Sequence, residues 1–171
     1  MTAAVETGLW QLDTTASTVA IRHKTMWGLV TVKGTFGVIS GRGEVRPDGS
    51  AVGTLTLDAA SLDTSSAKRD EHLRSADFFD VEHHPEITVA VRSDAPRDGD
   101  TAQFEGQLTV RGISRTQSFT AHLAEVSAGE VTLETEFAVD RESFGIGWNQ
   151  LGMMRGPATA KATLRFVRAD A

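Results

Sequence analysis

The segment Val131-Thr-Leu-Glu-Thr-Glu-Phe-Ala-Val139 alternates apolar and polar side chains with a period of two residues. Successive side chains of an extended strand point to opposite faces of a sheet, so this alternation predicts a β-strand with one buried face. The buried face would consist of Val131, Leu133, Phe137 and Val139. Glu134 and Glu136 would lie on the face that is exposed to water.

The same alternation recurs along most of the chain and predicts an all-β fold. Further strands are expected at 9–13, 17–24, 29–36, 39–46, 52–58, 87–92, 101–110, 117–125 and 159–168. Turn sequences such as Pro47-Asp-Gly-Ser50 and Ala128-Gly129 separate several of them. A length of 171 residues suits one domain. Many short antiparallel strands in one domain form a sandwich or a closed barrel, so we expect one such domain over residues 1–171.

The composition excludes several classes of function. The chain has no cysteine, so it can form no disulfide, thiolate metal site or cysteine nucleophile. A net charge of −6 argues against nucleic acid or an anionic membrane as the main partner. No segment approaches the roughly 20 apolar residues of a membrane span, and the N-terminal residues lack the basic and apolar regions of a signal peptide. We therefore expect a cytoplasmic protein without stable membrane insertion.

Strand parity places many small residues on the inward face. Four glycines and three alanines have this parity: Gly34, Gly41, Gly43, Gly106, Ala121, Ala160 and Ala162. A glycine leaves the interior unfilled, although glycines also form the bends and bulges that close a barrel. Together the small residues favour an internal cavity, because about eight strands enclose enough room for one small ligand. Large apolar residues share the inward parity: Val19, Ile21, Val30, Phe36, Ile39, Val89, Phe104, Leu108, Phe119 and Phe137.

The histidines and the known catalytic motifs give little indication of an enzyme. His23 has the inward parity, where it is either satisfied within the core or contacts a ligand oxygen. His72, His83 and His84 are expected in an exposed loop, because adjacent side chains point apart and Pro85 fixes the chain. The sequence contains no Gly-x-Ser-x-Gly, no His-Glu-x-x-His and no phosphate-binding glycine loop. We expect no catalytic site, no metal and no cofactor.

One helix is predicted between the strands, over residues 64–76. Ser65 or Ser66 can cap its N-terminus. Asp70 and Arg74 are four residues apart in the favourable order. The apolar stripe of Leu73 and Ala76 is too thin for a core helix, so the helix is expected to lie over another part of the protein.

The segment Arg69-Asp-Glu-His-Leu-Arg-Ser-Ala-Asp-Phe-Phe-Asp-Val-Glu-His-His-Pro-Glu-Ile87 resembles a pattern of the YceI-like family of lipocalin-shaped polyisoprenoid-binding proteins. The pattern here is Arg-Asp-x-His-Leu-x-Ser-x-Asp-Phe-Phe-Asp followed by a proline. Other blocks agree in order: Arg22-His23 after Trp10-x-x-Asp13, Lys33-Gly-x-Phe36, Ala60-Ser-Leu-Asp-Thr64, Gly106-x-Leu-Thr-Val-Arg-Gly-Ile-Ser-Arg115 and Asp140-Arg-x-x-Phe-Gly-Ile-Gly-Trp-Asn149. The resemblance covers roughly residues 9–168.

This resemblance implies an eight-stranded antiparallel lipocalin-like barrel with an elongated apolar pocket and a short helix near one end. It also implies binding of an isoprenoid-type lipid, such as a polyisoprenoid or an isoprenoid quinone, with no catalysis established for the family. The chain departs from the family at Ala16-Ser17, where His-Ser is usual, and after Trp148, where a glycine-rich run is usual. Ligand preference is therefore expected to differ.

In such a barrel the charged helix would cover one end, with Phe78 and Phe79 as apolar plugs. A charge cluster of Arg69, Asp70, Asp77, Asp140 and Arg141 would tie it to the loop before the last strand. Met153 and Met154 are flexible thioethers in a glycine- and proline-bounded loop, and they are expected to touch the ligand or the partner subunit of a homodimer. The predicted ligand-binding residues are Val19, Ile21, His23, Phe36, Gly43, Phe78, Phe79, Val89, Phe104, Gly106, Leu108, Phe119, Phe137, Phe144, Trp148, Met153 and Met154.

Two alternatives to a lipid carrier or sequestering protein follow from the same residues. The first is an enzyme that acts on an isoprenoid-type substrate with His23 as acid and base. The second is a packed barrel that serves as an interaction module.

Overall fold

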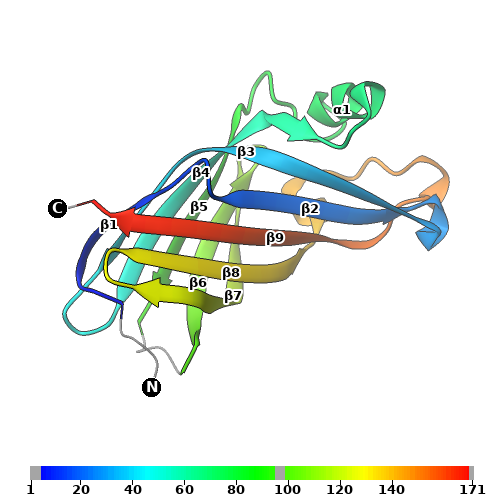
Figure 1. The fold of residues 1–171 in the computed structure, drawn as a ribbon. Coiled ribbons are helices and arrows are strands. Elements are labelled where there is room, and N and C mark those ends of the chain that lie inside the picture. Colours follow the sequence, from blue (N-terminus) through cyan, green and yellow to red (C-terminus); the bar gives the residue numbers. More distant parts are fainter. Residues whose placement is uncertain (1–4, 95–98, 170–171) are drawn as a thin grey trace.

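The computed structural model describes residues 5–94 and 99–169 and shows one antiparallel sheet that closes on itself (Figure 1). The first strands are β1 (Gly8–Leu12), β2 (Thr18–Thr25), β3 (Val30–Val45) and β4 (Ala51–Asp63). After helix α1 (Ala67–Arg74) follow β5 (Glu86–Ser93), β6 (Thr101–Val110), β7 (Ile113–Ser127), β8 (Glu130–Val139) and β9 (Arg155–Arg168). Single-turn 3-10 helices η1 (Met26–Gly28), η2 (Arg141–Phe144) and η3 (Gln150–Gly152) lie in the connections.

Nine strands make an eight-stranded barrel because β1 and β2 share one position between β3 and β9. β1 pairs with Arg42–Val45 of β3 and with Phe166–Arg168 of β9. β2 pairs with the other end of the same two strands. The bend at 13–17 therefore divides one long strand, here called the split strand. The predicted eight-stranded antiparallel barrel with a short helix is confirmed, and a closed barrel leaves no long unpaired edge.

The two strands expected at 29–36 and 39–46 are one strand, β3. Its pairing with β4 shifts register between Thr35 and Gly37 and again between Val38 and Ser40. An irregularity of this kind adds a residue and reverses the parity beyond it. As a result Val38 packs against the core while Ile39 is 49% exposed, so the inward placement of Ile39 was wrong. Val30, at the start of β3, is also exposed rather than inward.

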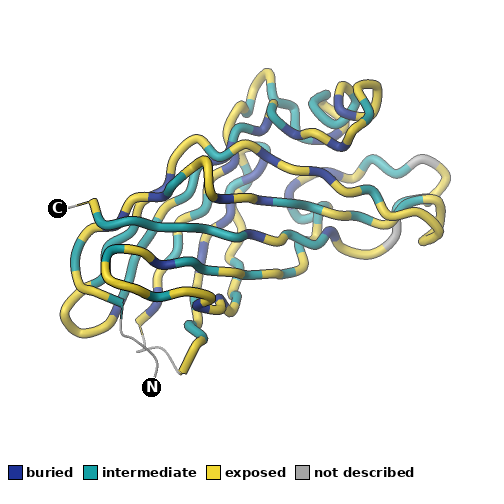
Figure 2. The backbone as a smooth tube through the Cα atoms, in the orientation of Figure 1, coloured by how far each residue is buried: buried dark blue, intermediate teal, exposed yellow. Residues whose placement is uncertain are grey.

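Buried and exposed positions alternate along the strands (Figure 2). The larger core cluster includes Phe36, Leu57, Leu62, Ile87 and Phe144, and a smaller one surrounds Trp10. Among the described residues no large side chain is less than 2% exposed. In a filled core several would be, so the interior retains open space. No helix in the described part of the chain is long and apolar enough to cross a bilayer.

Helix α1 and the turns after it form a cover over one end of the barrel, here called the lid (residues 64–85). Ser66 caps α1, since its side chain accepts a hydrogen bond from the backbone N–H of Arg69 at 3.3 Å. Buried Asp70 accepts bonds from both the N–H and the hydroxyl of Thr64. Arg69 donates to the Thr64 hydroxyl at 2.8 Å and to its carbonyl at 2.7 Å. These bonds fix the start of α1 to the end of β4.

Candidate ligand cavity

The barrel encloses a cavity of about 570 Å³ with walls of mostly apolar side chains. Ligand cavities in proteins usually measure roughly 300–1,000 Å³. Eleven of the predicted site residues line this barrel cavity: Val19, Ile21, Phe36, Gly43, Phe79, Val89, Phe104, Leu108, Phe119, Phe137 and Phe144. Its size and lining suit an apolar chain.

The cavity exists because one wall is built from small residues. Ala158, Ala160 and Ala162 all face it from β9. Ala160 lies between its two cross-strand partners, Phe137 on β8 and Ile21 on β2, so the short side chain leaves a channel between two large ones.

An aromatic wall continues from β8 around the barrel. Phe104, Phe119 and Phe137 come from the three adjacent strands β6, β7 and β8. Their ring centroids are 5.8 Å apart for the first pair and 5.3 Å for the second, with nearly parallel planes. Stacked rings of this kind present a continuous apolar surface.

Three of the four inward glycines are closely packed, contrary to the prediction, although Gly34 also borders a second cavity described below. A methyl group added at Gly41 would lie 2.9 Å from Leu12, and one at Gly34 would lie 2.9 Å from Leu62. At Gly106 it would meet Val91 at 3.0 Å and Phe119 at 3.2 Å, and Gly106 does not line the cavity. Only Gly43 lines the barrel cavity with its nearest neighbour at an ordinary distance, the Val52 carbonyl at 3.4 Å. These glycines therefore allow close packing, and the alanines of β9 make room.

A second cavity of about 580 Å³ lies between the lid, the ends of β2 and β3, and the segment before β9. It contains the remaining predicted site residues apart from Gly106: His23, Phe78, Trp148, Met153 and Met154. Five residues line both cavities, so the two spaces adjoin: Ile21, Phe79, Arg141, Ile146 and Ala158.

The second cavity, here called the lid cavity, is basic. Its lining includes Arg22, Lys68, Arg69, Arg141, His23 and His72, and none of the described residues that line it is acidic. Arg141 stands where the two cavities meet and donates from Nη1 to the carbonyls of Ile146 and Trp148, both at 2.8 Å. Within the described residues its Nε and Nη2 meet no protein acceptor. These two donors are available to a ligand oxygen.

His23 presents an unpaired ring nitrogen in the lid cavity. Its Nδ1 lies 2.7 Å from the carbonyl oxygen of Lys24. A carbonyl only accepts, so Nδ1 carries the proton, and in the neutral ring Nε2 is an acceptor. Nε2 is buried and has no partner among the described residues. The side chain is half-buried and lines the lid cavity rather than the barrel cavity.

The predicted charge cluster does not form. Among the described residues no ion pair joins Arg69, Asp70, Asp77, Asp140 and Arg141 to one another. Asp77 bonds to His72 at 2.9 Å, and Asp140 caps η2 through the N–H of Glu142. Each polar group is satisfied within its own segment, which local geometry makes less costly than a long-range pair.

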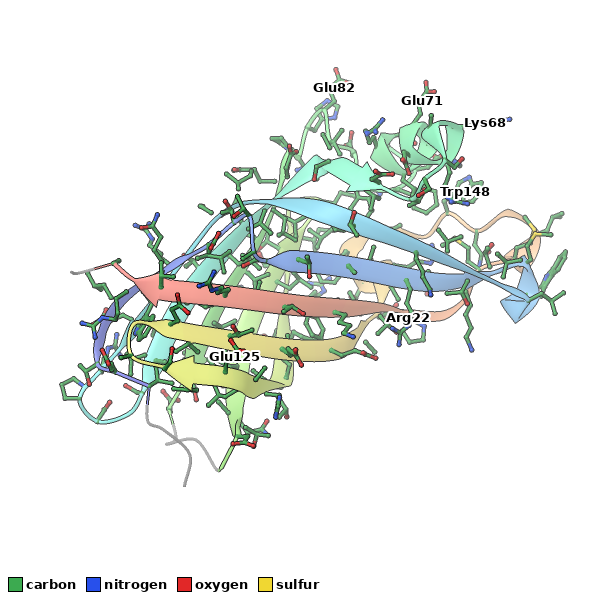
Figure 3. The ribbon with its side chains drawn as sticks, viewed as in Figure 1. Arg22, Lys68, Glu71, Glu82, Glu125 and Trp148 are labelled. Carbon is green, nitrogen blue, oxygen red and sulfur yellow. The ribbon has the colours of Figure 1, made fainter. Side chains whose placement is uncertain are left out.

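Aromatic rings connect the lid to the segment before β9 instead. The ring of Trp148 lies 4.6 Å from that of His72 and 5.3 Å from that of Phe78. Figure 3 shows Trp148 next to α1, with Glu71 on the outer side of that helix. Phe78 is buried, and Phe79 packs edge-on against Phe36 at 5.6 Å. Both phenylalanines thus point inward, as predicted for the lid.

The other histidines have local structural contacts. His83 bonds to Asp80 at 3.0 Å and is largely exposed, while the His84 ring fills the space beside Gly112. Within residues 5–94 and 99–169, no three His, Asp or Glu side chains lie close enough to hold a metal ion.

Sequence reasoning missed several residues of the lid cavity, chiefly Arg22, Lys68 and Ile146. Arg141 was placed in a charge cluster rather than in the site. The block Asp140-Arg-x-x-Phe-Gly-Ile-Gly-Trp-Asn149 contains Arg141, Ile146 and Trp148, so the signal was present there but gave no direction for the side chains.

Comparisons with known proteins agree with this architecture. A model of the YceI-like domain matches residues 10–166. Two curated relatives are each 38% identical over 69 residues, or 40% of this chain: a UPF0312 protein of Pectobacterium atrosepticum and protein YceI of Escherichia coli. The matched segment spans only 35% and 36% of those proteins.

Two solved structures share the fold at low sequence identity. BcnA of Burkholderia cenocepacia has a TM-score of 0.81 at 23% identity, covering 90% of this chain and 98% of BcnA. A polyisoprenoid binding domain from Saccharophagus degradans has a TM-score of 0.74 at 15% identity, covering 95% of this chain and 99% of that domain.

Proposed function

This chain belongs to the YceI-like domain family, and on that basis we propose that its barrel binds and carries or sequesters an isoprenoid-type lipid, or a similar amphiphile, without catalysis. The barrel of Saccharophagus degradans that shares its fold is described as a polyisoprenoid binding domain, which supports this class of ligand.

The observation that carries the proposal is the pair of adjoining cavities with different chemistry. The barrel cavity offers aromatic and aliphatic walls, and the lid cavity offers basic side chains. An amphiphile with an apolar chain and one oxygen-bearing head group matches both. We place the apolar chain of the ligand in the barrel cavity and its head group beside Arg141, where the two cavities meet.

His23 restricts the chemistry of the head group that can bind in the lid cavity. Because Nε2 of the neutral ring is an acceptor, its best partner is a ligand hydroxyl that donates a proton. The free donors of Arg141 suit the lone pairs of the same or a neighbouring oxygen. A prenyl alcohol or a reduced quinone satisfies both groups, whereas a hydrocarbon satisfies neither.

The environment of His23 supports binding rather than acid–base catalysis. A catalytic histidine is usually oriented by a carboxylate on its second nitrogen. Here the second nitrogen bonds to the backbone carbonyl of Lys24. No acidic side chain among the described residues lines the lid cavity.

The test compares a prenyl alcohol with the hydrocarbon of the same chain length, by displacement of a fluorescent lipid. Parent protein is expected to prefer the alcohol by roughly fivefold to tenfold, since a net hydrogen bond contributes about 1 kcal/mol. His23→Phe should lose this preference and keep its affinity for the hydrocarbon. His122→Phe, on the exposed face of β7, is the matched control.

Mass spectrometry of organic extracts from gently purified protein should also find a prenyl-type lipid. The proposal fails if the parent protein binds neither probe and the extract contains no lipid. Equal affinity of the parent protein for both probes would remove His23 and Arg141 from the site, whereas an unchanged preference for the alcohol in His23→Phe would remove His23 alone.

A further inference from the structure

Five large apolar side chains are exposed at the end of the barrel next to the lid cavity. Met26, Trp27 and Leu29 belong to the β2–β3 connection, Val30 is the first residue of β3, and Leu151 belongs to η3; together they are called the apolar tip. Leu29 is 86% exposed and Leu151 77%, and the other three are exposed by 44% to 48%. Only two further large apolar residues of the described chain are exposed, Leu9 and Ile39. Such a concentration marks an interaction surface.

Hydrogen bonds from Trp27 connect the two loops of the apolar tip. Its backbone N–H donates to the carbonyl of Met153 at 2.9 Å, and its indole N–H donates to the carbonyl of Leu151 at 3.2 Å. Figure 1 shows the β2–β3 connection and the loop before β9 at the same end of the molecule. The exposed side chains are thus held on a structured base.

The backbone of the apolar tip is strained. Met26, Trp27 and Leu151 have positive φ angles of 52°, 57° and 56°. Residues with a side chain rarely adopt this conformation, because the Cβ atom crowds the backbone. Because these side chains are exposed, packing in the core does not offset the free-energy cost of the positive φ angles. Strain that is maintained at such a place indicates a role outside folding.

The charge around the apolar tip differs from that of the whole chain. Residues 22–34 and 145–156 contain no aspartate or glutamate, although the chain carries a net charge of −6. Arg22, Lys24 and Lys33 lie on the two strands that lead to the tip, and Arg22 and Lys33 are cross-strand partners. Arg22 pairs with Glu136, whereas Lys24 and Lys33 have no ion-pair partner in the described part of the chain.

We propose that the apolar tip docks on the surface of an anionic lipid bilayer. Tryptophan favours the interface between head groups and acyl chains, and leucines beside it can enter the acyl boundary. Lys24 and Lys33 would then face the anionic head groups, which attract basic side chains near the surface. Salt screens the attraction of Lys24 and Lys33 to the head groups, so docking should weaken as salt rises. The acidic remainder of the barrel repels the anionic surface, which keeps docking reversible.

Docking would bring the lid cavity to the membrane. Met153, whose carbonyl holds Trp27, also lines that cavity. Lipid transfer between bilayer and cavity at this site rests on the proposed function, but the docking itself does not.

The experiment measures co-sedimentation of the ligand-free protein with vesicles of phosphatidylcholine containing phosphatidylglycerol, and with vesicles of phosphatidylcholine alone. Parent protein should partition more strongly to the anionic vesicles, and high salt should reduce this. The double variant Leu29→Ser/Leu151→Ser should lose about tenfold or more in partitioning, since two leucine side chains no longer enter the bilayer. Leu9→Ser/Ile39→Ser removes as many exposed apolar side chains elsewhere and should match the parent protein.

Brominated acyl chains locate the contact. They should quench the fluorescence of the parent protein, and Trp27→Phe should abolish that quenching. The proposal is overturned if parent protein does not sediment with anionic vesicles, or if both double variants lose partitioning equally. It is also overturned if the tip variant converts a dimer to a monomer without affecting sedimentation. Affinity of the tip variant for a prenyl alcohol is measured separately, so failure of docking and failure of lipid binding are distinguishable.

Discussion

At the scale of single residues, glycines with the same strand parity have different surroundings. Parity states which way a side chain would point, but not what already stands there. Leu12 from the split strand occupies the space at Gly41, and Val91 and Phe119 crowd Gly106. The sequence could predict that these glycines and the alanines of β9 lie on the inward face of the sheet. Whether the space beside each glycine is already occupied depends on side chains from strands that are distant in the sequence.

Substitutions at Gly106 and Gly43 should therefore separate in stability. Gly106→Val overpacks a filled site, which typically costs about 1–3 kcal/mol, so the melting temperature should fall by roughly 2–12 °C. Gly43→Ala should melt within about 2 °C of the parent protein and reduce the lipid bound in the barrel cavity. Thermal melting of ligand-free protein checks both. The reverse order of melting temperatures would contradict this assignment of the two glycines.

The pair of Asp80 and His83 should make the lid sensitive to pH. Its hydrogen bond raises the pKa of His83 above 6.5 and lowers the pKa of Asp80 below 3.8. The His83 contribution is fully present below pH 6.5 and is lost as pH rises through the raised pKa. The Asp80 contribution is present above pH 3.8 and is lost as pH falls through the lowered pKa. The pair thus stabilises the lid most between these values.

Titration of the His83 ring by NMR measures this effect. The midpoint should lie above the ordinary value in parent protein and return towards it in Asp80→Asn. His122, exposed on β7, serves as the internal reference in both proteins. An unchanged His83 midpoint in Asp80→Asn would show that this contact is not made in solution.

At the scale of elements, α1 depends on Thr64 more than on its own short sequence. The Thr64 hydroxyl donates to buried Asp70 and accepts from Arg69. Thr64→Val keeps the shape and removes both bonds, which costs about 1–3 kcal/mol when a buried acceptor loses its donor. Hydrogen exchange of the α1 amides should accelerate while that of β7 stays unchanged. Thr116→Val, on the exposed face of β7, should leave α1 as it is in the parent protein.

The existence and type of the strands and of α1 were predictable from the sequence, whereas their lengths, their connections and the 3-10 helices η1, η2 and η3 were not. Period-two alternation located the strands, and the sequence offered Ser65 or Ser66 as the cap of α1, of which the structure uses Ser66. The two register shifts of β3 could not be foreseen, because they arise from pairing with β4. These shifts place the Ile39 side chain on the exposed face of the sheet instead of the predicted inward face. The lid contacts were also out of reach, since His72, Phe78 and Trp148 meet only in the folded barrel.

At the scale of the whole molecule, closure depends on a seam between the split strand and β9. Ser17 is buried at the bend, donates to the Asp13 carbonyl at 2.7 Å and accepts from the Arg165 N–H at 3.0 Å. Arg165 also pairs with Asp13 and Glu130. These bonds replace strand pairing where the split strand bends away.

Ser17→Ala should weaken this seam. The Arg165 N–H loses its acceptor, which costs roughly 1–3 kcal/mol and lowers the melting temperature by about 2–12 °C. Ser118→Ala, on the exposed face of β7, should melt with the parent protein. Calorimetry measures the melting temperatures of the parent protein, Ser17→Ala and Ser118→Ala. Equal melting temperatures for all three would show that the seam is stable without the Ser17 hydroxyl.

The split strand also sets the order of events during synthesis. A ribosome releases β1 and β2 first and β9 last, yet both halves of the split strand pair with β9. Until residues 155–168 emerge and pair, we expect an open trough in which β1, β2 and β8 have unpaired edges and the apolar inner surface is open to water or to a chaperone. A stalled chain therefore aggregates more readily than the finished barrel. The open trough is also a stage at which a lipid can be enclosed without passing the lid.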